Sequence, residues 1–392
     1  MKKILSLFLA ALLCICTYNP YVYADGKRPD NSELYSLSAA MIDGDTGRVL
    51  YEKNGDDIRA MASTTKIMTL ILALEYGNDE DVVTVSSYAA KMPDVQLGIC
   101  EGEQYYMRDL IYSMMLESHN DSAVAIAEHV GGDVSHFACM MNQKASEIGL
   151  SHTYFITPNG LDAKDEKGTH STTAIELALI MKYCIMDSPA ADKFIAVCQT
   201  RDYSFSDYEG KRHFSVHNKN RFLDMMQGVI AGKTGFTADA GYCYVAALNR
   251  DGRTYIIALL GCGWPGNKGY KWADSKKLFE YGIAAYDKAV VINNDYKTCS
   301  IDVLNGIEGD CTETYIKDAD INLLMCGDDM VEIRENIPES MEAPVSSGDI
   351  VGSVDIYVNG ELYDSLNVYA AESINRVSLI HYMKCVISDF LL

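Results

Sequence analysis

The chain has 392 residues, of which 48% are hydrophobic and 22% are charged, and its formal net charge at pH 7 is −22. This length is enough for two folded domains, and so acidic a surface argues against nucleic acid or anionic lipid as an electrostatic partner. The twelve cysteines include no C-x-x-C pair and no zinc-like spacing. We therefore expect mostly reduced, buried thiols rather than a disulfide framework.

Residues 1–24 are typical of a secretory signal peptide. Lys2 and Lys3 precede an apolar run over 4–16, and residues 22–24 end in a small residue suited to cleavage. The run is too short to span a membrane and stay there, although an uncleaved anchor is the alternative. We expect an exported mature chain, with a net charge of about −24, at the outer face of the cytoplasmic membrane, in the cell wall or outside the cell.

The next residues alternate between strand-like and helix-like patterns in the order of an α+β domain. The expected strands are 37–42, 49–52, 229–231, 242–248 and 254–262. The expected helices are 67–76, 107–116, 123–130 and 274–286. This order predicts an antiparallel sheet covered by helices, with a mostly helical lobe inserted into it.

Ser63 and Lys66 stand three residues apart at the start of an expected helix, so their side chains share one face. Ser63 then lies at the positive end of the helix dipole, which favours a developing oxyanion. A hydroxyl beside an amine has the makings of a nucleophile with its own base. Alone this pair is a weak signal, because the spacing is frequent by chance.

Two further motifs follow in order, Ser118-His119-Asn120 and Lys233-Thr234-Gly235. The three motifs together resemble those of the serine penicillin-recognising enzymes. Their flanking residues are similar to those of the low-molecular-mass penicillin-binding proteins, the D-alanyl-D-alanine carboxypeptidases. The resemblance covers nearly the whole mature chain, and it implies a β-lactamase/transpeptidase-like domain followed by a small β-rich domain.

The resemblance implies separate sets of catalytic and substrate-binding residues. The catalytic set is Ser63 as nucleophile, Lys66 as general base, Ser118 as proton relay, and Asn120, which holds Lys66 and the substrate. The substrate-binding set is Lys233, Thr234, Gly235 and the backbone of Phe236, which shares the oxyanion hole with Ser63. The base must be a neutral amine, and burial and a neighbouring positive charge are the two effects that lower a lysine pKa.

The implied activity is removal of the terminal D-alanine from peptidoglycan stem peptides through an acyl-enzyme on Ser63, with covalent inhibition by β-lactams. The alternatives are a β-lactamase and a catalytically weak cell-wall-binding or scaffold protein. A class A β-lactamase carries a deacylating Glu in an E-x-x-L-N segment. The nearest approach, Glu176, lacks the Asn, and we expect it to be exposed. We expect no cofactor and no metal, because His213 and His217 share a strand face without a third ligand.

Three residues depart from the family's pattern. His119 stands where the family usually has Gly, and its ring either narrows the cleft or points away. Lys271 stands where many relatives have an Arg that supports carboxylate binding, and Asn159 replaces a His common in the family. We expect the segments 157–162 and 170–172 to line the site in a structural role.

The character of the chain changes after the expected catalytic domain, 25–289. Residues 291–371 hold three basic side chains and seventeen acidic ones. Short strands are expected at 301–304, 349–354 and 356–358. We therefore expect 290–371 to form a β-rich domain, which we interpret as a spacer or docking module. Asn359-Gly360 is a hairpin turn. The end of the chain, 372–392, lays out as an amphipathic helix. It either anchors the protein to a membrane surface or docks on the protein's own β-rich domain.

Overall fold

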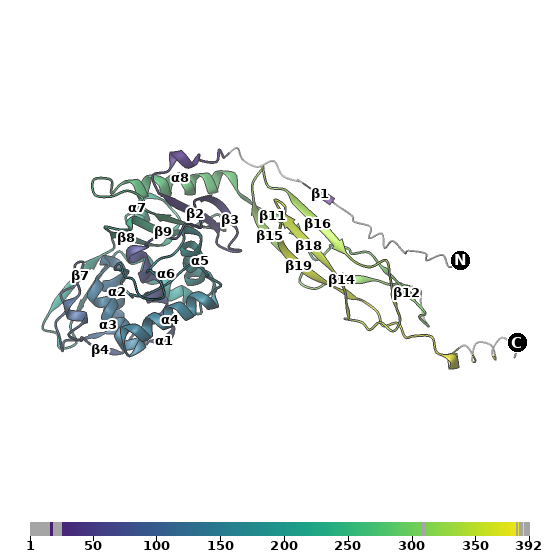
Figure 1. Cartoon of the computed structure of the whole chain (residues 1–392), viewed down its shortest axis with the longest axis horizontal. Coiled ribbons are helices and arrows are strands. Elements are labelled where there is room, and N and C mark those ends of the chain that lie inside the picture. The colour runs from purple at the N-terminus through teal and green to yellow at the C-terminus, as the bar shows by residue number, and fades with distance from the viewer. Residues whose placement is uncertain (1–15, 19–25, 308–310, 382, 384–386, 388–392) are drawn as a thin grey trace. The chain divides into compact units, whose positions relative to one another are not determined.

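The computed structural model describes residues 16–18, 26–307, 311–381, 383 and 387. The chain divides into two compact units (Figure 1). One runs from Gly26 to Ala285, and the other combines Tyr286–Leu392 with the residues before Gly26. Each unit has a hydrophobic core of its own.

A five-stranded antiparallel sheet forms the centre of the 26–285 unit. In spatial order its strands are β3 (Val49–Lys53), β2 (Ser38–Asp43), β10 (Arg253–Leu260), β9 (Gly241–Arg250) and β8 (Val229–Thr237). Successive residues of β2 face opposite sides. Ala40 and Ile42 join the core beneath the helical lobe, whereas Met41 lies beside Gly282 on the other side. Both faces of the central strands are buried, which explains their continuous apolar runs.

Helices cover both faces of this sheet (Figure 1). The α-helices are α1 (Lys66–Tyr76), α2 (Met107–Glu117), α3 (Asn120–Gly131), α4 (Val134–Glu147), α5 (Ala174–Lys182), α6 (Ala191–Gln199), α7 (Phe222–Met225) and α8 (Tyr270–Ala285). Shorter 3-10 and π turns are η1 (Asn31–Glu33), η2 (Ala62–Thr65), η3 (Ala89–Lys91) and η4 (Tyr183–Asp187). α8 packs beside Met41, and α5 packs on the opposite face with the rest of the lobe. The expected α+β arrangement is therefore confirmed.

The chain around Ser63 differs from expectation in one detail. The helix does not begin as an α-helix at Ser63, because η2 forms a 3-10 turn before α1 starts at Lys66. The Thr65 hydroxyl donates to the Ala62 carbonyl at 2.8 Å. Such local bonds compete with α-helical ones and tighten the first turn.

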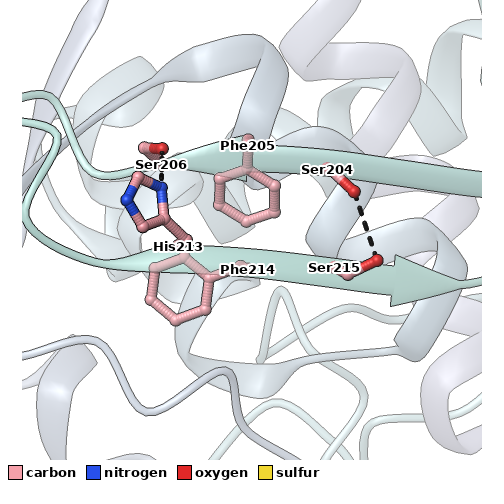
Figure 2. Close-up of a pocket in the computed structure, with 6 residues that line it drawn as sticks. All are labelled: Ser204, Phe205, Ser206, His213, Phe214 and Ser215. Carbon is pink, nitrogen blue, oxygen red and sulfur yellow. Dashed lines mark hydrogen bonds between the residues drawn. The ribbon is translucent and has the colours of Figure 1, made fainter.

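Two antiparallel ribbons border the lobe. β4 (Val82–Thr84) pairs with β5 (Gln104–Tyr106), and β6 (Asp202–Ser206) pairs with β7 (His213–His217). Figure 2 shows two cross-strand bonds of the second ribbon, Ser206 Oγ to His213 Nδ1 at 2.6 Å and Ser204 Oγ to Ser215 Oγ at 3.2 Å. His213 and His217 share one face, as expected, and each bonds across the ribbon, the latter to Asp202. Among the described residues, no three side chains are grouped as metal ligands.

The second unit consists of short strands. They are β1 (Cys16–Tyr18), β11 (Asp287–Ile292), β12 (Ile301–Leu304), β13 (Cys311–Thr312), β14 (Thr314–Ile316), β15 (Ile321–Met325), β16 (Val331–Asn336), β17 (Ser340–Glu342), β18 (Ile350–Val358) and β19 (Glu361–Ala370). The largest sheet has the order β1-β16-β18-β19-β14. The two strands expected at 349–354 and 356–358 are one continuous strand, β18, so that expectation was wrong. The turn at Asn359-Gly360 is confirmed, with φ values of 54° and 85°.

Several expectations fall on the chain ends and the cysteines. The expected signal peptide lies outside the described residues apart from β1, and the expected terminal helix is described only in part. No described helix is long and apolar enough to cross a membrane. Mostly buried thiols were expected. Among the described residues Cys184, Cys198, Cys243 and Cys262 are buried and Cys326 is partly buried, but Cys100, Cys139, Cys299 and Cys311 are exposed.

Candidate active site

The three sequence motifs meet where η2, the α2–α3 turn and β8 come together. Lys66, the first residue of α1, is fully buried, and its Nζ lies 2.9 Å from Ser63 Oγ. The same Nζ lies 2.9 Å from Asn120 Oδ1 and 2.6 Å from the Asn159 carbonyl. The ammonium form of Lys66 is disfavoured chiefly by burial and next by the charge of Lys233, so its pKa is well below the usual value.

Lys233 and Ser118 face each other from β8 and the end of α2. Lys233 Nζ lies 2.8 Å from Ser118 Oγ and also donates to the Thr234 carbonyl at 2.8 Å. Burial lowers the pKa of Lys233 from 10.5 to about 7. Ser118 caps α2 in the left-handed conformation, with φ 70° and ψ 30°. This conformation turns the chain sharply into α3, which begins at Asn120.

β8 runs against η2, the turn that holds Ser63, at Gly235. A side chain is excluded there, because a Cβ on Gly235 would lie 2.9 Å from the Ser63 backbone nitrogen. Phe236, the next residue, is 42% exposed, and its ring lies 4.7 Å from that of Tyr242. The backbone of this stretch of β8 therefore lies close to Ser63, while the Phe236 ring faces outward.

The segment around Asn159 closes the back of the site. Its carbonyl lies 2.6 Å from Lys66 Nζ and 3.4 Å from Ser63 Oγ. The next residue, Gly160, has φ 83°, and a Cβ on it would lie 2.0 Å from the Ala62 carbonyl oxygen. Only glycine fits this close approach in that conformation. The expected position of 157–162 beside the site agrees with these contacts.

Asn120 is held from outside by the loop before β5. Its backbone N–H donates to the Val95 carbonyl at 2.7 Å, and its side-chain amide donates to the Pro93 carbonyl at 3.0 Å. The loop continues over the Asp121 carboxylate, which accepts from the backbone N–H groups of Leu97 and Gly98. Its backbone is thus tied to the start of α3 over several residues.

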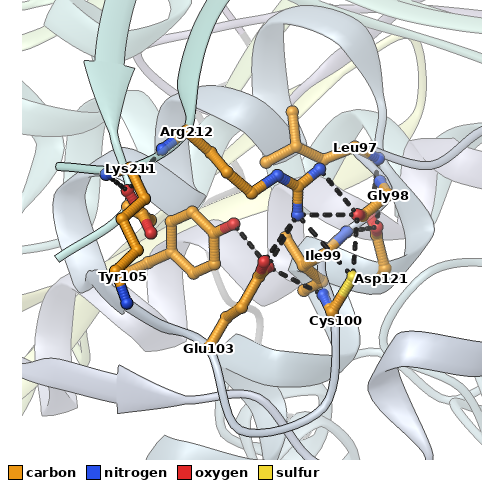
Figure 3. Close-up of polar contacts among 10 residues, drawn as sticks. Leu97, Gly98, Ile99, Cys100, Glu103, Tyr105, Asp121, Lys211 and Arg212 are labelled. Atoms are coloured by element: carbon orange, nitrogen blue, oxygen red, sulfur yellow. Dashed lines mark hydrogen bonds and ion pairs between the residues drawn. The ribbon is translucent and has the colours of Figure 1, made fainter. Parts of the chain in front are cut away.

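Figure 3 shows a second anchor of this loop. Arg212 donates to the Gly98 carbonyl at 3.1 Å and pairs with Glu103 at 2.7 Å. The Tyr105 hydroxyl donates to the same carboxylate at 2.8 Å. The Arg212 guanidinium therefore links the loop over Asn120 to the β6–β7 ribbon.

The residues that depart from the family's pattern have defined places. The His119 ring points away from the cleft, because its Nδ1 lies 2.8 Å from Ser113 Oγ inside the lobe. Lys271 donates to the Lys268 carbonyl at 2.8 Å and lies over the Tyr242 ring at 4.5 Å. Burial lowers the pKa of Lys271 to about 8.

Two further expectations concern the residues behind the site. His170 is buried, and its Nε2 lies 2.8 Å from Thr65 Oγ1 at the end of η2, a contact that agrees with the structural role expected for 170–172. The expectation that Glu176 is exposed was wrong, since only 6% of it is exposed. Its carboxylate accepts from the N–H groups of Ser151 and His152. A hydrogen-bonded carboxylate near a helix start is favourable, and this tertiary contact has no local sequence signal.

Residues 25–263 match the family described as D-alanyl-D-alanine carboxypeptidase. The chain belongs to this family. As a D-alanyl-D-alanine carboxypeptidase it is a serine peptidase, a hydrolase, and membership implies peptidoglycan peptides as substrates and binding of β-lactams. Residues 326–376 match the C-terminal domain of penicillin-binding protein 5. The family expected from the three motifs is thereby confirmed.

Individual carboxypeptidases support the same conclusion over the whole chain. D-alanyl-D-alanine carboxypeptidase DacF of Bacillus subtilis (strain 168) is 29% identical over 100% of this chain and 99% of its own length. DacC of Escherichia coli (strain K12) is 27% identical over 92% of this chain and 89% of its own. The solved structure of penicillin binding protein 5 from Haemophilus influenzae aligns with a TM-score of 0.71 at 25% identity, covering 89% of this chain and 99% of its own.

Proposed function

We propose that Ser63 is the nucleophile of this carboxypeptidase and Lys66 its general base. The observation that carries the proposal is the set of three oxygens around Lys66 Nζ, from Ser63, Asn120 and Asn159. A neutral amine has two N–H groups and one lone pair. If the two carbonyl oxygens take both N–H groups, the lone pair remains for the Ser63 O–H, which is the arrangement that activates a hydroxyl.

We propose the following reaction for these groups. Ser63 Oγ attacks the carbonyl carbon of the penultimate D-alanine while its proton passes to Lys66 Nζ. Ser118 relays this proton to the departing amine as the C–N bond breaks. D-alanine then leaves, and the rest of the peptide remains as an ester on Ser63. Water hydrolyses the ester and restores the hydroxyl.

We propose that β8 binds the substrate's C-terminal end. Lys233 in its ammonium form attracts the free carboxylate with help from the Thr234 hydroxyl. The close approach of Gly235 to the Ser63 nitrogen supports an oxyanion hole formed by the backbone N–H groups of Ser63 and Phe236.

The test is Ser63→Ala in the mature protein. The variant should release no D-alanine from a peptide ending in D-Ala-D-Ala and should form no covalent penicilloyl adduct detectable by mass spectrometry. Its thermal midpoint should be unchanged. A stoichiometric adduct in this variant would remove Ser63 from the proposal.

A β-lactamase activity is the second candidate function, and Glu176 argues against it. The Glu176 carboxylate is occupied by the N–H groups of Ser151 and His152 and by the Thr153 hydroxyl at 2.6 Å. These bonds engage both carboxylate oxygens at the start of α5. Loss of a positioned base costs about 10²–10⁴ in rate, so we propose a penicilloyl ester on Ser63 that lasts minutes or longer. Rapid multiple-turnover hydrolysis of benzylpenicillin would contradict this.

Export and surface attachment are further parts of the proposal. The pattern of 1–24 supports secretion with cleavage after Ala24, which N-terminal sequencing of the mature protein tests. Leu379 and Ile380 are 77% and 67% exposed, and Met383 is 57% exposed. These apolar side chains support an interfacial terminal helix, with 290–371 as the spacer. Deletion of 378–392 should release an active enzyme from membranes, and unchanged membrane association would oppose the anchor.

A further inference from the structure

His119 lies between two residues of the site, yet its side chain belongs to the interior of the lobe. The residue is only 6% exposed. Its Nδ1 lies 2.8 Å from Ser113 Oγ on α2, and that hydroxyl lies 2.8 Å from Ser122 Oγ on α3. Ser113 and Ser122 are both completely buried. The ring therefore fastens the turn between α2 and α3 to both helices.

The other side of the ring faces a carboxylate. His119 Nε2 lies 3.8 Å from Glu117 Oε2. Glu117 also accepts from the His217 N–H at 3.0 Å and pairs with Lys219 at 3.3 Å. Burial lowers the pKa of the imidazole, opposed by Asp121 and Glu117, which favours the neutral ring. Because a hydroxyl both donates and accepts, Ser113 bonds Nδ1 in either tautomer of that ring.

Hydroxyl, imidazole and carboxylate stand here in the order of a hydrolytic triad. Ser113 is wholly buried, however, so a substrate cannot reach its hydroxyl. The group is consequently not a second active site, and its effect must pass through the backbone of the turn.

The turn itself needs support. Ser118 is a non-glycine residue at φ 70°, and left-handed conformations of such residues persist only where the surroundings impose them. Ser118 Oγ lies 2.8 Å from Lys233 Nζ, and Asn120 Oδ1 lies 2.9 Å from Lys66 Nζ. Both distances depend on the backbone on either side of His119.

We propose that His119 is a positioning residue, which holds Ser118 and Asn120 against the two lysines through its hydrogen bond to Ser113. The inference rests on the proposed roles of Ser63 and Lys66. Loss of the bond lets the turn relax, and a misplacement of about 1 Å at a reacting group costs about 10²-fold in rate.

Two substitutions separate the hydrogen bond from simple filling of space. An asparagine places an amide atom where Nδ1 lies, so His119→Asn keeps the bond to Ser113. A leucine has similar bulk and no polar atom, so His119→Leu keeps the packing and loses the bond. Ser113→Ala removes the same bond from the other end, and with it the bond from Ser113 to Ser122. Ser122→Ala removes only that second bond and is therefore its control.

The experiment measures acylation of the full-length mature protein by a fluorescent penicillin, D-alanine release and the thermal midpoint. We expect acylation to slow about tenfold or more in His119→Leu and Ser113→Ala, and to stay near the wild-type rate in His119→Asn. The double variant that combines His119→Leu with Ser113→Ala should be slower than His119→Leu by no more than Ser122→Ala is slower than wild type. The midpoints of His119→Leu and His119→Asn should differ little.

Acylation at the wild-type rate in Ser113→Ala, or equal slowing in His119→Leu and His119→Asn, overturns the inference. Ser113→Ala also decides the matter if His119→Leu does not fold. The site of the wild-type adduct is mapped first by mass spectrometry. An adduct away from Ser63 refutes the proposed function, whereas an adduct on Ser63 with either of the overturning rates refutes only the role of His119.

Discussion

Replacing Gly160 by alanine tests how closely η2, the turn that holds Ser63, and the 157–162 segment depend on each other. The new Cβ would lie 2.0 Å from the Ala62 carbonyl oxygen, so the two segments must separate by roughly 1 Å or more. Lys66 Nζ and Ser63 Oγ both contact the carbonyl of Asn159, one residue away. A shift of about 1 Å at reacting groups costs about 10²-fold in rate, which is the expected loss in acylation.

The same substitution lowers stability by two separate effects. Alanine in the left-handed region costs about 1–2 kcal/mol, and overpacking of a filled interior adds about 1–3 kcal/mol. The free energy of unfolding should fall by about 2–5 kcal/mol, which corresponds to a melting temperature lower by roughly 4–20 °C for a unit of this size.

Gly149→Ala is the matched control, because Gly149 has φ 80° but open space around it. It carries the backbone cost without the clash. Penicillin acylation and thermal unfolding of the two variants are compared with wild type. Gly160→Ala should lose both acylation and stability, and Gly149→Ala should lose only a little stability. Equal acylation rates in the two variants would refute the reasoning.

Three further predictions concern other parts of the same unit. The folded pKa of Lys233 is about 7, below the 10.5 of the free side chain, so between these values the unfolded state binds the extra proton, and this group alone should raise the free energy of unfolding by about 2 kcal/mol from about pH 7 to pH 9. The lowered pKa values of Lys66 and Lys271 act in the same direction. In urea titrations the rise should therefore be smaller by about 2 kcal/mol in Lys233→Met than in wild type, and an equal rise in the two proteins would contradict the lowered pKa of Lys233. Glu75 lies 2.9 Å from Lys144, with both side chains buried. In urea denaturation, Glu75→Ala should lower the free energy of unfolding by about 3–5 kcal/mol. A loss below about 1 kcal/mol would be inconsistent with a buried pair. Arg212 donates to the Gly98 carbonyl in the loop before β5, so Arg212→Gln should loosen this loop and speed maleimide labelling of the exposed Cys100 severalfold. An unchanged labelling rate would show that the guanidinium does not hold the loop.

The elements that sequence patterns predicted well are those set by local periodicity. The strands β2, β9 and β10 and the helices α1 and α2 are apolar runs or amphipathic repeats bounded by turn residues, so they were predicted nearly to their ends. β18 was split in two because Asp355 interrupts its apolar pattern. Its carboxylate accepts from the Ser365 hydroxyl on the paired strand β19. A cross-strand partner of this kind cannot be predicted from the sequence of one strand alone.

The site was harder to predict where backbone or tertiary contacts decide. The Asn159 carbonyl beside Lys66 has no sequence signal, because every residue has a carbonyl. Glu176 was misjudged because its partners precede it by some two dozen residues. The inward direction of His119 did have a signal. Ser113 and Ser122 stand on the two helices that flank it, and a buried imidazole requires polar partners of that kind.

The position of β8 at the edge of its sheet bears on how the protein avoids pairing with other chains in crowded surroundings. Within the described strands, the topology gives β8 a single neighbour, β9, and an edge of this kind is a template for pairing with another chain. Here the edge lies against η2 at Gly235 and is bridged to the α2–α3 turn by Lys233 and Ser118. The turn that holds Ser63 and the α2–α3 turn therefore occupy part of the space beside this edge that a further strand would need. These contacts shorten the stretch of β8 backbone that could pair with another chain, so the two turns that form the candidate site also limit edge-to-edge aggregation.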